Sequence, residues 1–188
     1  MLNPPKKPVN ASNFSKELLD KIEWNCDLFG EPVVTSFRGK KSAGRSAAET
    51  GGLFESAVSE VIHNVGLPFE KKPKYINYCN MEDRQGDFRV FCKNGASIWI
   101  EAKQLGNCES HTEKLAYIWM NSYKGAYGSH FILVYDFDIS CKNSQKHYSK
   151  LQKYVNEEWF PHNRAAGRTV DFVYIGDLEE YLEKYNNV

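Results

Sequence analysis

Apolar residues along the chain follow two spacings, one typical of helices and one typical of strands. Between Leu53 and Val65 they recur at the helical period, and Gly66 follows as a stop signal. The run 130–137, HFILVYDF, is almost wholly apolar, as expected for a central strand covered on both faces. The segment 169–175, TVDFVYI, predicts another strand. Helices and strands therefore alternate along the chain.

Weaker patterns predict the remaining elements. The first is a helix over 15–30, with Ser15 as N-cap and Gly30 as stop, and it is followed by an edge strand over 69–80, limited by Pro73, and a hairpin over 86–104. A helix then follows the capping box Ser110 and Glu113. The last two are an amphipathic helix over 144–159 and a helix from Asp177 to Tyr185. The resulting order is helix, three strands, helix, strand, helix, strand, helix. It predicts a three-layer α/β domain with a central mixed β-sheet flanked by helices, in which residues 1–188 form one domain and 1–12 are frayed.

The hairpin over 86–104 allows two registers. A two-residue turn at Asn94-Gly95 places Asp87 opposite Ala102, so that the side chains of Asp87 and Glu101 point to opposite faces. A three-residue loop, 93–95, places Asp87 opposite Glu101. In that second register every side chain on the other face is apolar, from Phe88 to Ala102. This clean partition favours the three-residue loop.

The favoured register gathers charged side chains on one face of the hairpin. Asp87 and Glu101 would face each other across ~5 Å, a distance at which two carboxylates repel unless a cation lies near. Oxygen ligands of this kind suit Mg²⁺, with Mn²⁺ as a substitute. Lys103 lies two residues beyond Glu101 on the same face, where a cation can orient water and stabilise a phosphoryl transition state.

The sequence GD, followed after 13 residues by EAK, resembles the catalytic motif of the PD-(D/E)xK nuclease superfamily. The resemblance covers residues 50–136 and implies a restriction-endonuclease-like αβββαβ core. It also implies that Asp87 and Glu101 bind metal and that Lys103 is the catalytic lysine. It further implies roles for two residues, which are Glu55 as an additional metal ligand and Gln104 as an accessory catalytic residue. Gly86 stands where the motif has proline.

Each of these assignments has a simpler alternative. Asp87, Glu101 and Lys103 would be an ordinary solvated face if the hairpin were exposed, although the neighbouring sequence IWIEA is very apolar. Glu55 borders the apolar stripe of its helix and is equally well explained as a surface acid. Gln104 is equally compatible with an ordinary hydrogen-bonding role.

Charge and composition refine the expected partners and location. The 24 basic and 24 acidic residues cancel, so any nucleic-acid interface must be local. The loop 37–52 holds a basic cluster consisting of Arg38, Lys40, Lys41 and Arg45. For a nuclease these residues are expected to contact DNA phosphates, and otherwise they form a solvated loop. Five widely spaced cysteines, no signal peptide and no long apolar run predict a soluble, cytoplasmic protein with reduced thiols and no membrane partner.

Together these features predict a Mg²⁺-dependent DNA endonuclease. The first expectation is a homodimeric type II restriction endonuclease, whose two-fold symmetry would match palindromic DNA. One alternative is a structure-selective nuclease that resolves Holliday junctions or acts in repair. A second is a non-catalytic nucleic-acid-binding module of the same fold.

Overall fold

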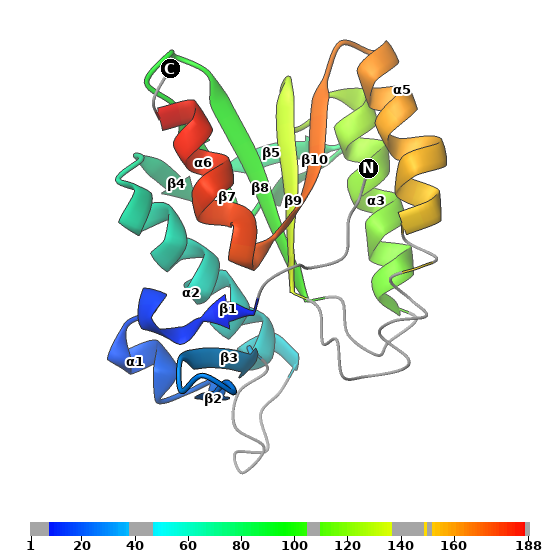
Figure 1. Cartoon of the computed structure of the whole chain (residues 1–188). Helices are drawn as coiled ribbons and strands as arrows, with labels where there is room; N and C mark the ends of the chain where they lie inside the picture. Colours follow the sequence, from blue (N-terminus) through cyan, green and yellow to red (C-terminus); the bar gives the residue numbers. More distant parts are fainter. Residues whose placement is uncertain (1–7, 38–46, 105–109, 137–148, 150–151, 187–188) are drawn as a thin grey trace.

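A five-stranded mixed β-sheet forms the centre of the molecule (Figure 1). The computed structural model describes residues 8–37, 47–104, 110–136, 149 and 152–186. In spatial order the strands are β10 (Thr169–Tyr174), β9 (His130–Asp136), β8 (Ser97–Gln104), β7 (Phe88–Phe91) and β4 (Phe69–Lys71). Strands β8, β9 and β10 run parallel, whereas β7 and β4 are antiparallel to their neighbours. The predicted strands at 130–137 and 169–175 are confirmed as β9 and β10.

Helices cover both faces of this sheet (Figure 1). They are α2 (Ala47–Val65) and α6 (Leu178–Asn186) on one face, and α3 (Ser110–Lys124) and α5 (Phe160–Ala165) on the other. The helix predicted over 53–65 and the last predicted helix are confirmed as α2 and α6. The expected α/β fold, a mixed sheet flanked by helices, is therefore confirmed.

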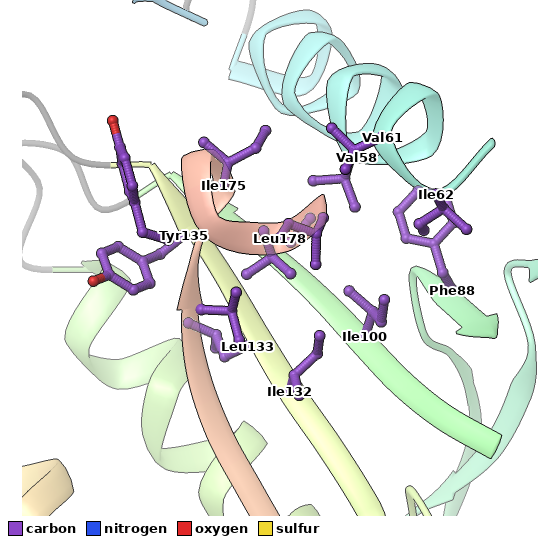
Figure 2. Close-up of a cluster of buried hydrophobic side chains, with 14 of the residues drawn as sticks. Val58, Val61, Ile62, Phe88, Ile100, Ile132, Leu133, Tyr135, Ile175 and Leu178 are labelled. Carbon is purple, nitrogen blue, oxygen red and sulfur yellow. The ribbon is translucent and has the colours of Figure 1, made fainter. Parts of the chain in front are cut away.

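The strands alternate side chains between two apolar layers. On the α2 and α6 face, Ile100 and Ile132 pack with Val58 and Leu178, as Figure 2 shows. On the opposite face Phe131 stacks on Trp159, with ring centroids 6.4 Å apart. Because successive strand residues point to opposite faces, continuous burial of β9 requires a helix layer on each side.

Residues 144–159 were predicted as one amphipathic helix, and much of this segment lies outside the described residues. Its end is a π-helical turn over Val155–Trp159 that leads directly into α5. Trp159 in this turn is fully buried, and its indole N–H donates to the Ser122 hydroxyl of α3 at 2.9 Å. The turn thereby joins α5 to α3 on one face of the sheet.

The helix predicted over 15–30 is wrong beyond its first turn. Ser15 does cap a helix, α1, but α1 spans only Lys16–Leu19. The chain then forms β2 (Glu23–Cys26) and β3 (Pro32–Ser36), which together with β1 (Val9–Asn10) make a small separate sheet. Gly30, with φ of +84°, belongs to the turn between β2 and β3 and does not end a helix. Residues 24–26, Trp-Asn-Cys, favour helix only weakly, so strand pairing prevails there.

The single edge strand predicted over 69–80 is also wrong, because the chain breaks at Lys72 and Pro73. Lys72 adopts a left-handed conformation with φ of +54°. The chain before it is β4, and the chain after it is β5 (Lys74–Asn77), which pairs with β6 (Glu82–Gln85) in a separate hairpin. The side-chain oxygen of Asn121 in α3 accepts from the Tyr78 N–H at 2.8 Å and ties this hairpin to the domain.

The hairpin of β7 and β8 has the favoured register. Phe88 pairs with Ile100 and Phe91 with Ser97. The Cys92 N–H then donates to the Ala96 carbonyl at 2.8 Å, which leaves residues 93–95 as a three-residue loop. Gly95 has φ of +81°, the left-handed conformation that this loop requires.

Gly95→Val is expected to destabilise the fold by about 1 kcal/mol, because a β-branched residue reaches positive φ only with strain. No heavy atom lies within 4 Å of an added Cβ, so backbone strain is the only cost. Urea unfolding of Gly95→Val and Gly95→Asn tests this, since asparagine adopts positive φ more readily. Equal stability of both variants and the parent would show that the loop relaxes to another conformation.

Candidate functional site

Asp87 and Glu101 lie side by side, Asp87 directly before β7 and Glu101 within β8. The register that pairs Phe88 with Ile100 places Asp87 opposite Glu101. Both residues are buried, Asp87 with 7% and Glu101 with 6% exposure. The alternative of a solvated hairpin face is therefore wrong. The register that places all apolar side chains of the hairpin on one face also predicted that Asp87 and Glu101 share the other face. This prediction is confirmed.

The ammonium group of Lys103 bridges the two acids. Its Nζ donates to Asp87 Oδ2 at 3.1 Å, to Glu101 Oε2 at 3.0 Å and to the Ala102 carbonyl at 3.1 Å. Asp87 Oδ2 also accepts from the Ala102 N–H at 2.8 Å. These bonds fix both carboxylates and supply the cation that two adjacent buried acids need.

The two acids have pKa values shifted in opposite directions. Burial alone would raise the pKa of Asp87, but the charge of Lys103, the Ala102 N–H and the charge of Lys72 together lower it. Burial raises the pKa of Glu101 to about 7; the Asp87 charge adds to this rise, while Lys103 opposes it. Burial lowers the pKa of Lys103, but the charges of Glu101 and Asp87 outweigh burial and raise it overall. Lys103 is therefore protonated at neutral pH and serves as a donor and a positive charge.

Gly86, where the motif has proline, has a steric explanation. An added Cβ at this position would lie 3.3 Å from Glu101 Oε1 and 3.3 Å from a ring carbon of Trp99. Both distances are tighter than ordinary van der Waals contact. Glycine thus lets the Glu101 carboxylate lie against the backbone that precedes Asp87.

Glu55 of α2 reaches the site only through a second lysine. Lys72 Nζ lies 2.6 Å from Glu55 Oε2 and 3.2 Å from Asp87 Oδ1. In the described part of the chain, no three His, Cys, Asp or Glu side chains are grouped in a way that could hold a metal ion. Of the three predicted metal ligands, Asp87 and Glu101 are thus adjacent, whereas the ammonium group of Lys72 separates Glu55 from Asp87.

Gln104 ends β8 beside Lys103. Its side-chain Nε2 is buried and has no hydrogen-bond partner among the residues that the structure describes. A buried donor without a partner is costly in free energy. The basic cluster, Arg38, Lys40, Lys41 and Arg45, lies outside the described residues.

Three site residues were missed by sequence reasoning. Lys72 was read as part of a strand, although its place before Pro73 signals a break there. Tyr75 and Tyr127 pack together, with ring centroids 4.9 Å apart, and both contact Trp99. Burial, and next the nearby charge of Glu101, raise the pKa of Tyr127. Nothing in the local sequence marks either tyrosine as a neighbour of the acids.

The donor set fits a hard divalent cation in its chemistry. Asp87 and Glu101 offer carboxylate oxygens only, and the ammonium of Lys103 occupies the position between them, while that of Lys72 lies on the other oxygen of Asp87. Carboxylate oxygens with room for water are what Mg²⁺ and Mn²⁺ prefer. The two residues that would hold the ion are Asp87 and Glu101.

No helix in the described ranges is both long and apolar enough to cross a membrane. Comparisons with protein-family models, with curated proteins and with solved structures found no match to this chain. The residues and geometry of the site therefore carry the functional argument.

Proposed function

We propose that this protein is a Mg²⁺-dependent DNA endonuclease of the PD-(D/E)xK type. The observation that carries the proposal is the buried Asp87–Glu101 pair bridged by Lys103 Nζ at 3.1 and 3.0 Å. Burying two carboxylates lowers the stability of the fold, because both must be removed from water. A pair with only a structural role would be more stable on a solvated surface. When the separate β5–β6 hairpin between β4 and β7 is set aside, the order α2, β4, β7, β8, α3, β9 resembles the αβββαβ order of that superfamily, which supports the proposal.

The reaction is hydrolysis of a phosphodiester by a water molecule. The water oxygen forms a bond to phosphorus, and the bond to the 3′ oxygen breaks, which leaves 5′-phosphate and 3′-hydroxyl ends. Mg²⁺, when bound by Asp87 and Glu101, would acidify the water and polarise the phosphate. Manganese is expected to substitute for it.

Lys103 and Gln104 act on the reacting groups directly. The Lys103 ammonium, protonated at neutral pH, would donate to the attacking water or to a phosphate oxygen and offset the charge that develops there. The buried Nε2 of Gln104, at the end of β8, would supply a further donor. The four residues of the basic cluster are proposed to contact DNA phosphates away from the cut.

The proposed cellular role is a homodimeric type II restriction endonuclease. The test is to incubate the purified protein and Mg²⁺ with plasmid, genomic DNA and a four-way junction. Discrete plasmid fragments are expected. Cutting of the junction alone would indicate a resolving nuclease instead. Binding without cleavage of any of the three substrates would contradict the proposed activity and indicate a non-catalytic module.

A further inference from the structure

Lys72 completes an alternating chain of charges through the site. Glu55, Lys72, Asp87, Lys103 and Glu101 follow one another, and each neighbouring pair is within 3.2 Å. The two oxygens of Asp87 are divided between the lysines, with Oδ1 accepting from Lys72 and Oδ2 from Lys103. Three acids and two ammoniums nearly neutralise one another without any metal ion.

The backbone holds Lys72 beside Asp87. The Lys72 N–H donates to the Asp87 carbonyl at 3.0 Å, and the Gly86 N–H donates to the Pro73 carbonyl at 2.9 Å. Lys72 also adopts φ of +54°, which is uncommon for a residue with a Cβ. Strained conformations of this kind persist where the surrounding structure fixes them, often at functional sites.

The two lysines differ in how firmly their ammonium groups are held. Lys103 Nζ has three acceptors, and its side chain is 28% exposed. Lys72 Nζ has two carboxylate acceptors, and its side chain is 47% exposed. A divalent cation bound to Asp87 would repel both ammoniums, and Lys72 is the one that can leave toward solvent on a flexible stem.

We propose that Lys72 is a resident counter-ion that holds Asp87 and Glu55 in place in the metal-free protein and competes with the divalent cation for them. The inference rests on the proposed function, because it takes Asp87 as a metal ligand. It assigns Lys72 a positioning role that sets metal affinity. The side chain releases Asp87 when metal binds, while the backbone stays fixed by the Lys72 N–H bond to the Asp87 carbonyl and by the adjacent bond from the Gly86 N–H to the Pro73 carbonyl.

The experiment measures Mn²⁺ binding to the DNA-free protein by electron paramagnetic resonance of the free ion. Lys72→Met is expected to bind Mn²⁺ about tenfold more tightly than wild type. This factor corresponds to the energy of one charge-assisted hydrogen bond, which the Lys72 ammonium group would otherwise have to give up when the ion binds. The variant should also melt at a lower temperature without metal, and its melting temperature should rise more than that of wild type when Mn²⁺ is added. Lys72→Gln, which keeps a donor to the carboxylates but no charge, should likewise bind more tightly and serves if Lys72→Met does not fold.

Two controls complete the design. Lys74→Met removes an exposed lysine two residues away and should leave Mn²⁺ affinity unchanged, whereas Lys72→Arg keeps the charge and should not increase affinity. Unchanged or weaker Mn²⁺ binding by both neutral Lys72 variants overturns the inference. If Asp87→Asn then still abolishes binding, the metal centre stands and only the role of Lys72 fails. If Asp87→Asn leaves binding unchanged, the proposed metal centre and function fail with it.

Discussion

Lys103→Ala is expected to lower the rate of DNA cleavage at least a hundredfold, which corresponds to about 2.7 kcal/mol in barrier height. The lysine bridges both acids, beside which the water and the phosphate would react. Its contribution is larger in the transition state than in the bound substrate, so DNA binding should be largely retained. Single-turnover cleavage and gel-shift measurements on the same preparation separate the two effects.

Removing this ammonium also leaves Asp87 and Glu101 without their shared cation, so folding must be checked by circular dichroism. Lys93→Ala is the matched control, because Lys93 is an exposed lysine in the loop at the other end of the same hairpin. It should cleave at the wild-type rate. A Lys103→Ala variant that is folded and cleaves within about tenfold of wild type would contradict the role assigned to Lys103.

Glu101→Gln is expected to make the metal-free protein more stable at about pH 8 and to remove the loss of stability that Glu101 ionisation causes between about pH 5 and 7. The folded-state pKa of Glu101, about 7, lies above its ordinary value of 4.5. Between these pH values the folded protein retains a proton that the unfolded chain releases. Ionisation of Glu101 therefore lowers wild-type stability as pH rises through this window, by an amount on the order of 3 kcal/mol, whereas His130, whose pKa is lowered by burial, contributes in the opposite direction. Glutamine does not ionise and avoids this loss.

Urea unfolding at several pH values measures the effect. Asp87, whose pKa is lowered, changes stability only in more acidic solution, below its ordinary value of 3.8, and does not obscure the window. Glu70→Gln removes an exposed acid on β4 and should retain the wild-type pH profile. A Glu101→Gln variant that loses stability with rising pH as steeply as wild type would show that another group titrates in this range.

Local sequence determined the hairpin and its acid pair. The alternation from Phe88 to Ala102 leaves only one register in which all apolar side chains share a face, and Gly95 permits the loop that this register needs. The helical spacing of apolar residues over 53–65 likewise predicted α2, and the apolar runs at 130–137 and 169–175 predicted β9 and β10. An element that buries a whole face leaves such a pattern in the sequence. The register had already predicted that Asp87, Glu101 and Lys103 lie close together. The resemblance to a nuclease motif then suggested a role for each of them.

Local sequence did not determine the N-terminal segment or the neighbours of the acids. Residues 15–30 have a valid helix cap, yet pairing between β2 and β3, which only residues 27–31 separate, outweighs weak helix propensity. Lys72 reaches Asp87 only because β4 and β7 are paired and the chain turns at positive φ.

The same limit applies to Tyr127, which follows α3 and comes under the influence of the Glu101 charge only through the tertiary fold. The burial that raises the Glu101 pKa also comes from these distant elements. The sequence by itself determined which charged groups share one strand face, because side-chain alternation is a local property. Only the tertiary structure decided that Asp87 and Glu101 are buried and that Lys72 lies between Glu55 and Asp87, because burial and ion pairing depend on segments brought together by folding.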